Sequence, residues 1–209
     1  MKPSLAKIAA GYGTDKDTHQ FAGTAYTAVY EYYFQENRLA FTTILEIGVL
    51  HGASLLTWRD YFPDAMIWGL DIDPSANRDY GHRIKVITGS QIDPGAIARI
   101  APGQEFDVVI DDGSHVVDHL VETFRLLWPR VKPGGFYVME DLKESHRDIT
   151  GAHEGWPGQR YNRPDTNYKN DRRTLDKLFG SLLKDLDEKR GDARFIHFWH
   201  QQAFIGKIG

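Results

Sequence analysis

The stretch "TTILEIGVLHGASLLTWRDYF", residues 42–62, decides how this chain folds. Residues 42–49 are a short apolar run with β-branched side chains, which is typical of a buried strand. Residues 54–62 repeat apolar side chains at helical spacing, and Gly48 and Gly52 mark a turn between the two halves. A strand, a turn and a helix in this order predict the first unit of a parallel α/β sheet.

The same alternation continues along the chain. We expect further strands at residues 65–73, 83–90, 106–112 and 136–141, helices at 94–101 and 115–130, and a turn at 132–135. A helix at 174–188 and two strands at 193–200 and 203–208 follow. The pattern predicts an α/β fold with a Rossmann-like doubly wound sheet, mostly parallel, with a C-terminal antiparallel strand pair.

Two segments stand outside this alternation, within what we expect to be a single domain over residues 1–209. Apolar side chains recur on one helical face before the first strand, so we expect covering helices within residues 1–40. That face comprises Ala22, Tyr26, Val29, Tyr30, Tyr33 and Phe34. Residues 142–173 are polar and rich in glycine and proline, which predicts a long loop that acts as a substrate lid. Its aromatic residues Trp156, Tyr161 and Tyr168 could stack on a sugar or only hold the loop in place.

The composition excludes several classes of protein. The chain has 209 residues, of which 41% are hydrophobic, and its net charge of −4 lacks the basic character of a nucleic-acid-binding protein. Cysteine is absent, which excludes thiolate metal sites and fits a cytoplasmic location. The sequence has no apolar run long enough to span a membrane, and residues 1–16 lack the apolar core of a signal peptide. We further expect a homo-oligomer.

Polar residues lie at the ends of four predicted strands, where ligands of open α/β sheets bind. Glu46 belongs to the first strand, Asp71 ends the second, Ser90 and Gln91 follow the third, and Asp111–Asp112 ends the fourth. Any one of them could be a helix cap or a turn residue. Because the ends of parallel strands meet at one edge of the sheet, the set predicts a binding site.

The first turn indicates the charge of the ligand. Gly48 and Gly52 are spaced G-x-x-x-G, which is neither the dinucleotide pattern nor a P-loop. Glu46 beside this turn would repel a phosphate but would attract an ammonium or a sulfonium. Asp71 lies where an acidic residue commonly binds ribose hydroxyls. These features favour a cationic nucleoside without phosphates, and S-adenosylmethionine fits that description.

Several motifs together resemble a known family. The pattern E-x-G-x-x-x-G at residues 46–52, with an acidic second strand and "GSQ" at 89–91, resembles class I S-adenosylmethionine-dependent methyltransferases. "GYGTDK" (11–16), "IDDGSH" (110–115) and "MEDL" (139–142) narrow the resemblance to metal-dependent sugar O-methyltransferases. That group includes macrolide mycinose and rhamnosyl O-methyltransferases and the 1-O-methyltransferase of mycobacterial methylmannose polysaccharide. The resemblance covers residues 11–142.

The resemblance implies roles for individual residues. Asp112, Glu140 and Asp141 match the family's magnesium ligands, and His115 matches its general base. The positions that match cofactor contacts are Thr14, Lys16, Glu46, Gly48, Asp71, Ser90, Gln91 and Asp111, although Asp111 could instead cap the following helix. The implied partners are S-adenosylmethionine, Mg²⁺ and a saccharide or glycoside acceptor.

Electrostatics explains why three carboxylates at one edge of the sheet would indicate a bound cation. Asp112, Glu140 and Asp141 would repel one another at one sheet edge unless a cation joins them, and oxygen ligands favour Mg²⁺. A bound dication would lower the pKa of a hydroxyl, and His115 could take its proton. Glu140 and Asp141 are adjacent, so a regular strand would point them apart and the chain must bend for both to bind. The alternative is that Asp112 only caps a helix.

Several functions remain open from the sequence. The leading one is methylation of a sugar hydroxyl, possible acceptors being the 1-hydroxyl of a methylated mannoside or a macrolide or rhamnosyl sugar. A catechol-type phenol O-methyltransferase and a non-enzymatic nucleoside-binding protein are the alternatives. His115 and His119 have the spacing of a helical zinc pair, but the glutamate of that motif is missing, so we interpret His119 as a surface or packed residue.

Overall fold

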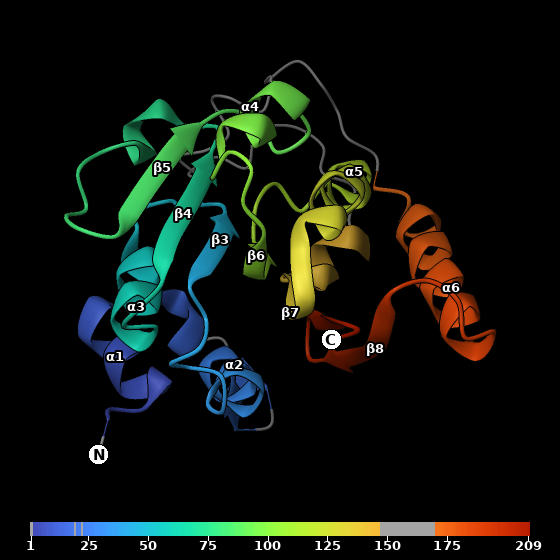
Figure 1. The fold of residues 1–209 in the computed structure, drawn as a ribbon, viewed down its shortest axis with the longest axis horizontal. Helices are drawn as coiled ribbons and strands as arrows, with labels where there is room; N and C mark the ends of the chain where they lie inside the picture. Colours follow the sequence, from blue (N-terminus) through green and yellow to red (C-terminus); the bar gives the residue numbers. More distant parts are fainter. Residues whose placement is uncertain (1, 19, 22, 147–169) are drawn as a thin grey trace.

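The computed structural model describes residues 2–18, 20–21, 23–146 and 170–209, whose arrangement is shown in Figure 1. A seven-stranded sheet forms its centre in the order β5-β4-β3-β6-β7-β9-β8. Neighbouring strands from β5 to β7 are parallel, whereas β9 is antiparallel to both β7 and β8. The strands are β3 (Thr43–Ile47), β4 (Met66–Asp71), β5 (Ile84–Thr88), β6 (Phe106–Asp111), β7 (Val131–Met139), β8 (Ala193–Trp199) and β9 (Gln202–Lys207). The predicted fold class is confirmed.

Helices cover both faces of the sheet, as a parallel sheet with two apolar faces requires (Figure 1). One face packs against α1 (Leu5–Tyr12), α2 (Tyr26–Phe34) and α3 (Ala53–Tyr61). The other packs against α4 (Pro94–Arg99), α5 (Val117–Leu127) and α6 (Arg172–Asp187). A two-stranded sheet of β1 (Gln20–Phe21) and β2 (Thr24–Ala25) precedes α2. None of the helices in the described ranges combines the length and apolar character that a membrane crossing requires.

The predicted turn at residues 132–135 is wrong. These residues lie inside β7, which begins at Val131 rather than at Phe136. Phe106 pairs with Val131 and Val108 pairs with Phe136, so residues 132–135 bulge opposite Asp107. Two glycines make this possible, because Gly134 has a φ of 75° and a Cβ on Gly135 would lie 2.7 Å from the Asp107 carbonyl oxygen.

Two predicted helices begin later than expected. The helix expected at 115–130 begins at Val117, because His115 adopts a left-handed φ of 57° that a helix cannot contain. It ends at Leu127 and continues as a 3-10 helix to Arg130. The helical face expected from residue 22 begins only at Tyr26, since residues 24–25 form β2, and Ala22 lies outside the described residues.

The turn after β3 depends on both glycines of the G-x-x-x-G pattern. Gly48 has a φ of 86°, and a Cβ there would lie 2.0 Å from the carbonyl oxygen of Asp112. Gly52 has a φ of 75°, and a Cβ there would lie 2.1 Å from the ring of Tyr80. The first glycine therefore lets the loops after β3 and β6 touch, which brings Glu46 and Asp112 to the same place.

We predict that Gly48→Ala destabilises the protein by about 3 kcal/mol or more, because it adds both backbone strain and a collision with backbone. Urea unfolding followed by fluorescence measures the change. Gly180→Ala in α6 is the matched control, since no atom lies within 4 Å of its added Cβ and its φ is not positive. That control should gain about 0.5–1 kcal/mol. Equal stability of Gly48→Ala and the parent chain would contradict the close-approach explanation.

Candidate active site

The segments that follow four parallel strands lie together at the carboxyl edge of the sheet. Backbone hydrogen bonds extend past the strand ends and hold these segments in line. Gly48 N donates to Leu70 O at 2.9 Å, Asp112 N to Ile47 O at 3.0 Å, and Glu140 N to Asp111 O at 3.0 Å. Side chains that the sequence separates by tens of residues therefore converge on one place.

Three side chains form a group that could hold a metal ion. One ligand atom each from Asp112, His115 and Asp141 lies within 4.8 Å of the others. His115 Nε2 is 4.0 Å from Asp141 Oδ2, and the Tyr26 hydroxyl donates a hydrogen bond of 3.0 Å to Asp141 Oδ1. His115 and Asp141 have φ angles of 57° and 52°. Left-handed backbone at both positions turns their side chains toward Asp112, which is the bend that the sequence required at Asp141.

Glu140 lies buried beside this group but is held by other partners. Its Oε1 accepts a hydrogen bond from the Tyr30 hydroxyl, and its Oε2 accepts one of 2.7 Å from Lys16 Nζ. Both carboxylate oxygens are thus engaged within the protein. The structure brings Asp112 and Asp141 together with His115 and places Glu140 with Lys16, so the predicted metal-ligand role of Glu140 stays a prediction.

Lys16 is buried among three carboxylates. Its Nζ lies 2.6 Å from Asp112 Oδ2, 2.7 Å from Glu140 Oε2 and 3.4 Å from Glu46 Oε1. Burial alone would lower the pKa of the ammonium group, but the attraction of the three carboxylates raises that pKa well above its ordinary value. Lys16 is therefore charged in the folded protein. The sequence singled out this residue as a cofactor contact and gave no indication of these ion pairs.

The predicted cofactor residues Glu46 and Asp71 are both engaged in fixing the first turn. Glu46 is fully buried, and its carboxylate accepts hydrogen bonds from Ser54 Oγ at 2.5 Å and Trp58 Nε1 at 3.2 Å. Asp71 Oδ2 accepts from the backbone N–H groups of Val49 at 2.7 Å and Leu50 at 3.0 Å. Both carboxylates are thereby held at fixed positions along the edge of the sheet.

The remaining predicted cofactor residues lie around the same edge. Thr14 is buried and precedes the 3-10 helix that carries Lys16, and Ser90 is half-buried after β5. The buried Gln91 donates to Asp111 at 3.1 Å and to Thr123 at 2.9 Å, and its Oε1 accepts from Ser114 N at 2.8 Å. These contacts tie the segments after β5 and β6 to α5.

Asp111 faces away from the metal-binding group. It is fully buried under α5, where Gln91 donates to one of its oxygens and the Tyr137 hydroxyl donates to the other at 3.1 Å. Burial raises the pKa of Asp111 to about 7, although these hydrogen bonds oppose the shift. Its predicted contact with a cofactor is untested, and its observed contacts are those of a structural residue.

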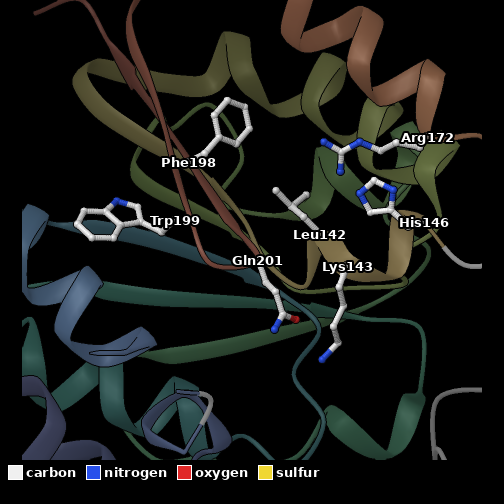
Figure 2. A pocket seen from close by; sticks show the side chains of 7 residues that line it. All are labelled: Leu142, Lys143, His146, Arg172, Phe198, Trp199 and Gln201. Atoms are coloured by element: carbon white, nitrogen blue, oxygen red, sulfur yellow. The ribbon is translucent and has the colours of Figure 1, made fainter. Parts of the chain in front are cut away.

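A depression opens next to Leu142, the residue that follows Asp141 (Figure 2). Phe198 and Trp199, both substantially exposed, lie at its upper and left sides, and His146 and Arg172 lie at its right. Lys143 and Gln201 extend together below Leu142. The lining thus offers aromatic rings together with hydrogen-bond donors, which suits a ligand that has both apolar and polar groups. Residues Trp156, Tyr161 and Tyr168, and most of the predicted lid at 142–173, lie outside the described residues.

Tyr26 and Tyr30 are site residues that the sequence assigned only to a covering helix. They point from α2 to Asp141 and Glu140, respectively. Burial and the neighbouring carboxylates raise the pKa of both hydroxyls, so each stays protonated and acts as a donor. The sequence did contain a signal for this role, namely tyrosines on the otherwise apolar face of the predicted helix. A buried tyrosine hydroxyl needs a hydrogen-bond partner, so such tyrosines indicate a polar group beneath the helix.

Comparisons with known proteins find similar chains among methyltransferases. Residues 45–142 match a family model described as a methyltransferase domain. The chain is 39% identical over 153 residues to the 8-demethyl-8-alpha-L-rhamnosyl tetracenomycin-C 2'-O-methyltransferase of Streptomyces olivaceus, covering 69% of this chain and 39% of that protein. It is 36% identical over 167 residues to the demethylmacrocin O-methyltransferase of Streptomyces fradiae, covering 75% of this chain and 38% of that protein.

A similar solved structure is the MycE methyltransferase of the mycinamycin biosynthetic pathway in complex with Mg, SAH and mycinamycin VI. The two share 32% sequence identity with a TM-score of 0.73, over 99% of this chain and 55% of that one. This chain thus spans 38% to 55% of the length of these relatives.

We predict that Asp111 makes the stability of the protein depend on pH. Its raised pKa means that the folded state binds this proton more tightly than the unfolded state, whose pKa is near 3.8. The stabilisation is complete below about pH 4 and is lost as the pH rises to about 7, to an upper limit of about 4 kcal/mol. Urea unfolding of the parent chain and Asp111→Asn at several pH values isolates this effect. Parallel pH profiles for the two proteins would contradict it.

Proposed function

We propose that this chain, which is similar to the methyltransferases just described, transfers a methyl group from S-adenosylmethionine to a sugar hydroxyl with the aid of a divalent cation. The observation that carries this proposal is the group of Asp112, His115 and Asp141 at the carboxyl edge of the sheet. It combines ligands for a cation with a base, and the acidic first turn lies beside it.

The two carboxylates of this group fit a divalent cation. Asp112 and Asp141 supply the hard oxygen ligands that Mg²⁺ prefers, which leaves the imidazole of His115 beside them to act as the base. When bound, such an ion would lower the pKa of an acceptor hydroxyl and fix its position. Glu140 would take part only if it exchanged one of its present hydrogen bonds for the ion.

The cofactor would lie along the edge formed by the ends of β3, β4 and β5. Glu46 supplies negative charge near the first turn, which favours the methionine end of a cationic nucleoside. Asp71 at the end of β4 would bind the ribose, and Ser90 and Gln91 after β5 would lie near the adenine. Thr14 precedes the 3-10 helix that covers this edge.

His115 would act as the general base. Methyl transfer forms a bond from the acceptor oxygen to the methyl carbon and breaks the bond from that carbon to sulfur, so the hydroxyl must lose one proton. His115 Nε2 lies 4.0 Å from Asp141 Oδ2, beside the place where a bound cation would hold an acceptor oxygen. An imidazole accepts such a proton near neutral pH.

The acceptor would enter by the depression beside Leu142 (Figure 2). A macrolide or polyketide glycoside with a rhamnose or related sugar fits its aromatic and polar lining. The named relatives favour this class over a methylated mannoside, since they act on rhamnosyl tetracenomycin and demethylmacrocin. The single-domain organisation, the lid at residues 142–173 and the homo-oligomeric state stay predictions.

We predict methyl transfer from labelled S-adenosylmethionine to rhamnosyl or macrolide glycosides that is abolished by a chelator and restored by Mg²⁺. Asp112→Asn should lose most of this activity, because it removes a charged ligand without changing the shape of the side chain. A panel of glycosides and catechols, analysed by mass spectrometry, measures the transfer. Full activity in excess chelator would exclude the metal site. Methylation of catechols alone would favour a phenol methyltransferase, and cofactor binding without any transfer would favour a non-enzymatic protein.

We predict that His115→Ala lowers turnover by about 10²–10⁴-fold at neutral pH, the usual contribution of a general base. The affinity for S-adenosylmethionine should hardly change, because the proton leaves the acceptor and not the sulfonium. Steady-state rates and calorimetric titration of the cofactor measure the two effects separately. His119→Ala is the matched control, since His119 bonds to Ser114 rather than to the metal-binding group. Near-normal turnover of His115→Ala would show that His115 is not the general base.

A further inference from the structure

Lys16 holds together carboxylates from three parts of the sheet. Glu46 belongs to β3, Asp112 follows β6, and Glu140 follows β7, yet all three lie within 3.4 Å of one ammonium nitrogen. The Lys16 side chain is 3% exposed, so water screens these ion pairs poorly. Among the described residues, Lys16 is the cation with which each of these three carboxylates forms an ion pair.

The segment that carries Lys16 is fixed independently of the ammonium group. Gly13 ends α1 in a left-handed conformation, and Lys16 lies in the following 3-10 helix, Asp15–Asp17. Asp17 Oδ1 accepts a hydrogen bond of 2.9 Å from the Thr27 hydroxyl of α2. The backbone around Lys16 is therefore anchored to both N-terminal helices, and the side chain reaches the sheet edge from a defined position.

Buried carboxylates without a counter-charge are costly, because their charged forms lose the solvation of water. If a divalent ion were the sole counter-charge, the carboxylates at the sheet edge would repel one another whenever the ion was absent. Lys16 supplies one positive charge to the carboxylates Glu46, Asp112 and Glu140. It bonds to one oxygen of Asp112, so the other oxygen and Asp141 remain for an ion.

We propose that Lys16 is a positioning residue that serves as a built-in counter-cation, holding Glu46, Asp112 and Glu140 in place so that the site is assembled before a divalent ion binds. The inference rests on the proposed function for the identity of that ion. It assigns Lys16 to the carboxylates, in place of the cofactor contact that the sequence indicated. The fold should then tolerate complete removal of metal.

The test is thermal unfolding of the full chain in excess chelator and in saturating Mg²⁺. In chelator, Lys16→Met should unfold about 6–20 °C below the parent chain, because it leaves buried carboxylates without their counter-charge. Mg²⁺ should raise the unfolding temperature of Lys16→Met by more than that of the parent. Lys16→Arg, which retains the charge, should lie closer to the parent chain than Lys16→Met does.

A double variant separates charge from packing. Lys16→Met with Glu140→Gln removes one negative charge along with the positive one, so it should recover much of the lost unfolding temperature in chelator. If Lys16 only filled space, the double variant would be no more stable than Lys16→Met, and that result would overturn the proposal. The proposal is also overturned if Lys16→Met unfolds in chelator at the same temperature as the parent chain. Should Lys16→Met fail to fold, recovery of a folded double variant still supports the proposal, and failure of both overturns it.

The experiment also distinguishes this proposal from the proposed function. A lack of any Mg²⁺ effect on the parent chain and on Lys16→Met would count against the metal in the reaction. It would leave the counter-charge role to be decided by the double variant in chelator, which needs neither ion nor substrate.

Discussion

Repulsion among carboxylates at the carboxyl edge of the sheet governs how the candidate site is built. Glu46, Asp112 and Glu140 are brought together because parallel strands end side by side, and each is shielded from water to a large extent. The molecule offsets their charge with an ammonium group and with hydroxyl donors from the N-terminal helices. The N-terminal segment is thus an electrostatic requirement of the sheet and more than a cover for its apolar face.

The backbone is strained at two residues next to these repelling carboxylates. His115 and Asp141 both occupy the left-handed region, which costs free energy for residues with a Cβ. The strain lets neighbouring residues face different partners: Asp141 turns to the metal-binding group while Glu140 turns to Lys16. A regular strand would also have separated the adjacent pair, but only by sending one of them to the opposite face of the sheet.

Local patterns in the sequence were sufficient for most of the fold. Apolar runs and helical spacing placed the strands and the order of the layers, because these signals depend on nearby residues. They failed at residues 132–135, where "KPGG" has the composition of a turn but pairs within β7 as a bulge. Asp112, His115 and Asp141, which the motifs singled out, lie together at one edge of the sheet. The ion pairs of Lys16 join residues 96 and 124 positions apart, and no local pattern encodes such contacts.

The place of β9 between β7 and β8 has a consequence for how the protein acquires its site during synthesis. Ala203 of β9 pairs with Met139 of β7, and Gln201 O accepts a hydrogen bond from Leu142 N just beyond Asp141. The segment next to the candidate ligands is therefore secured by a strand about 60 residues further along the chain. Contacts of such long range form slowly. On the ribosome, the parallel strands from β3 to β7 can pair before β9 has been made to secure the segment beside Asp141. A nascent chain would then have the parallel part of its sheet before it had a complete site.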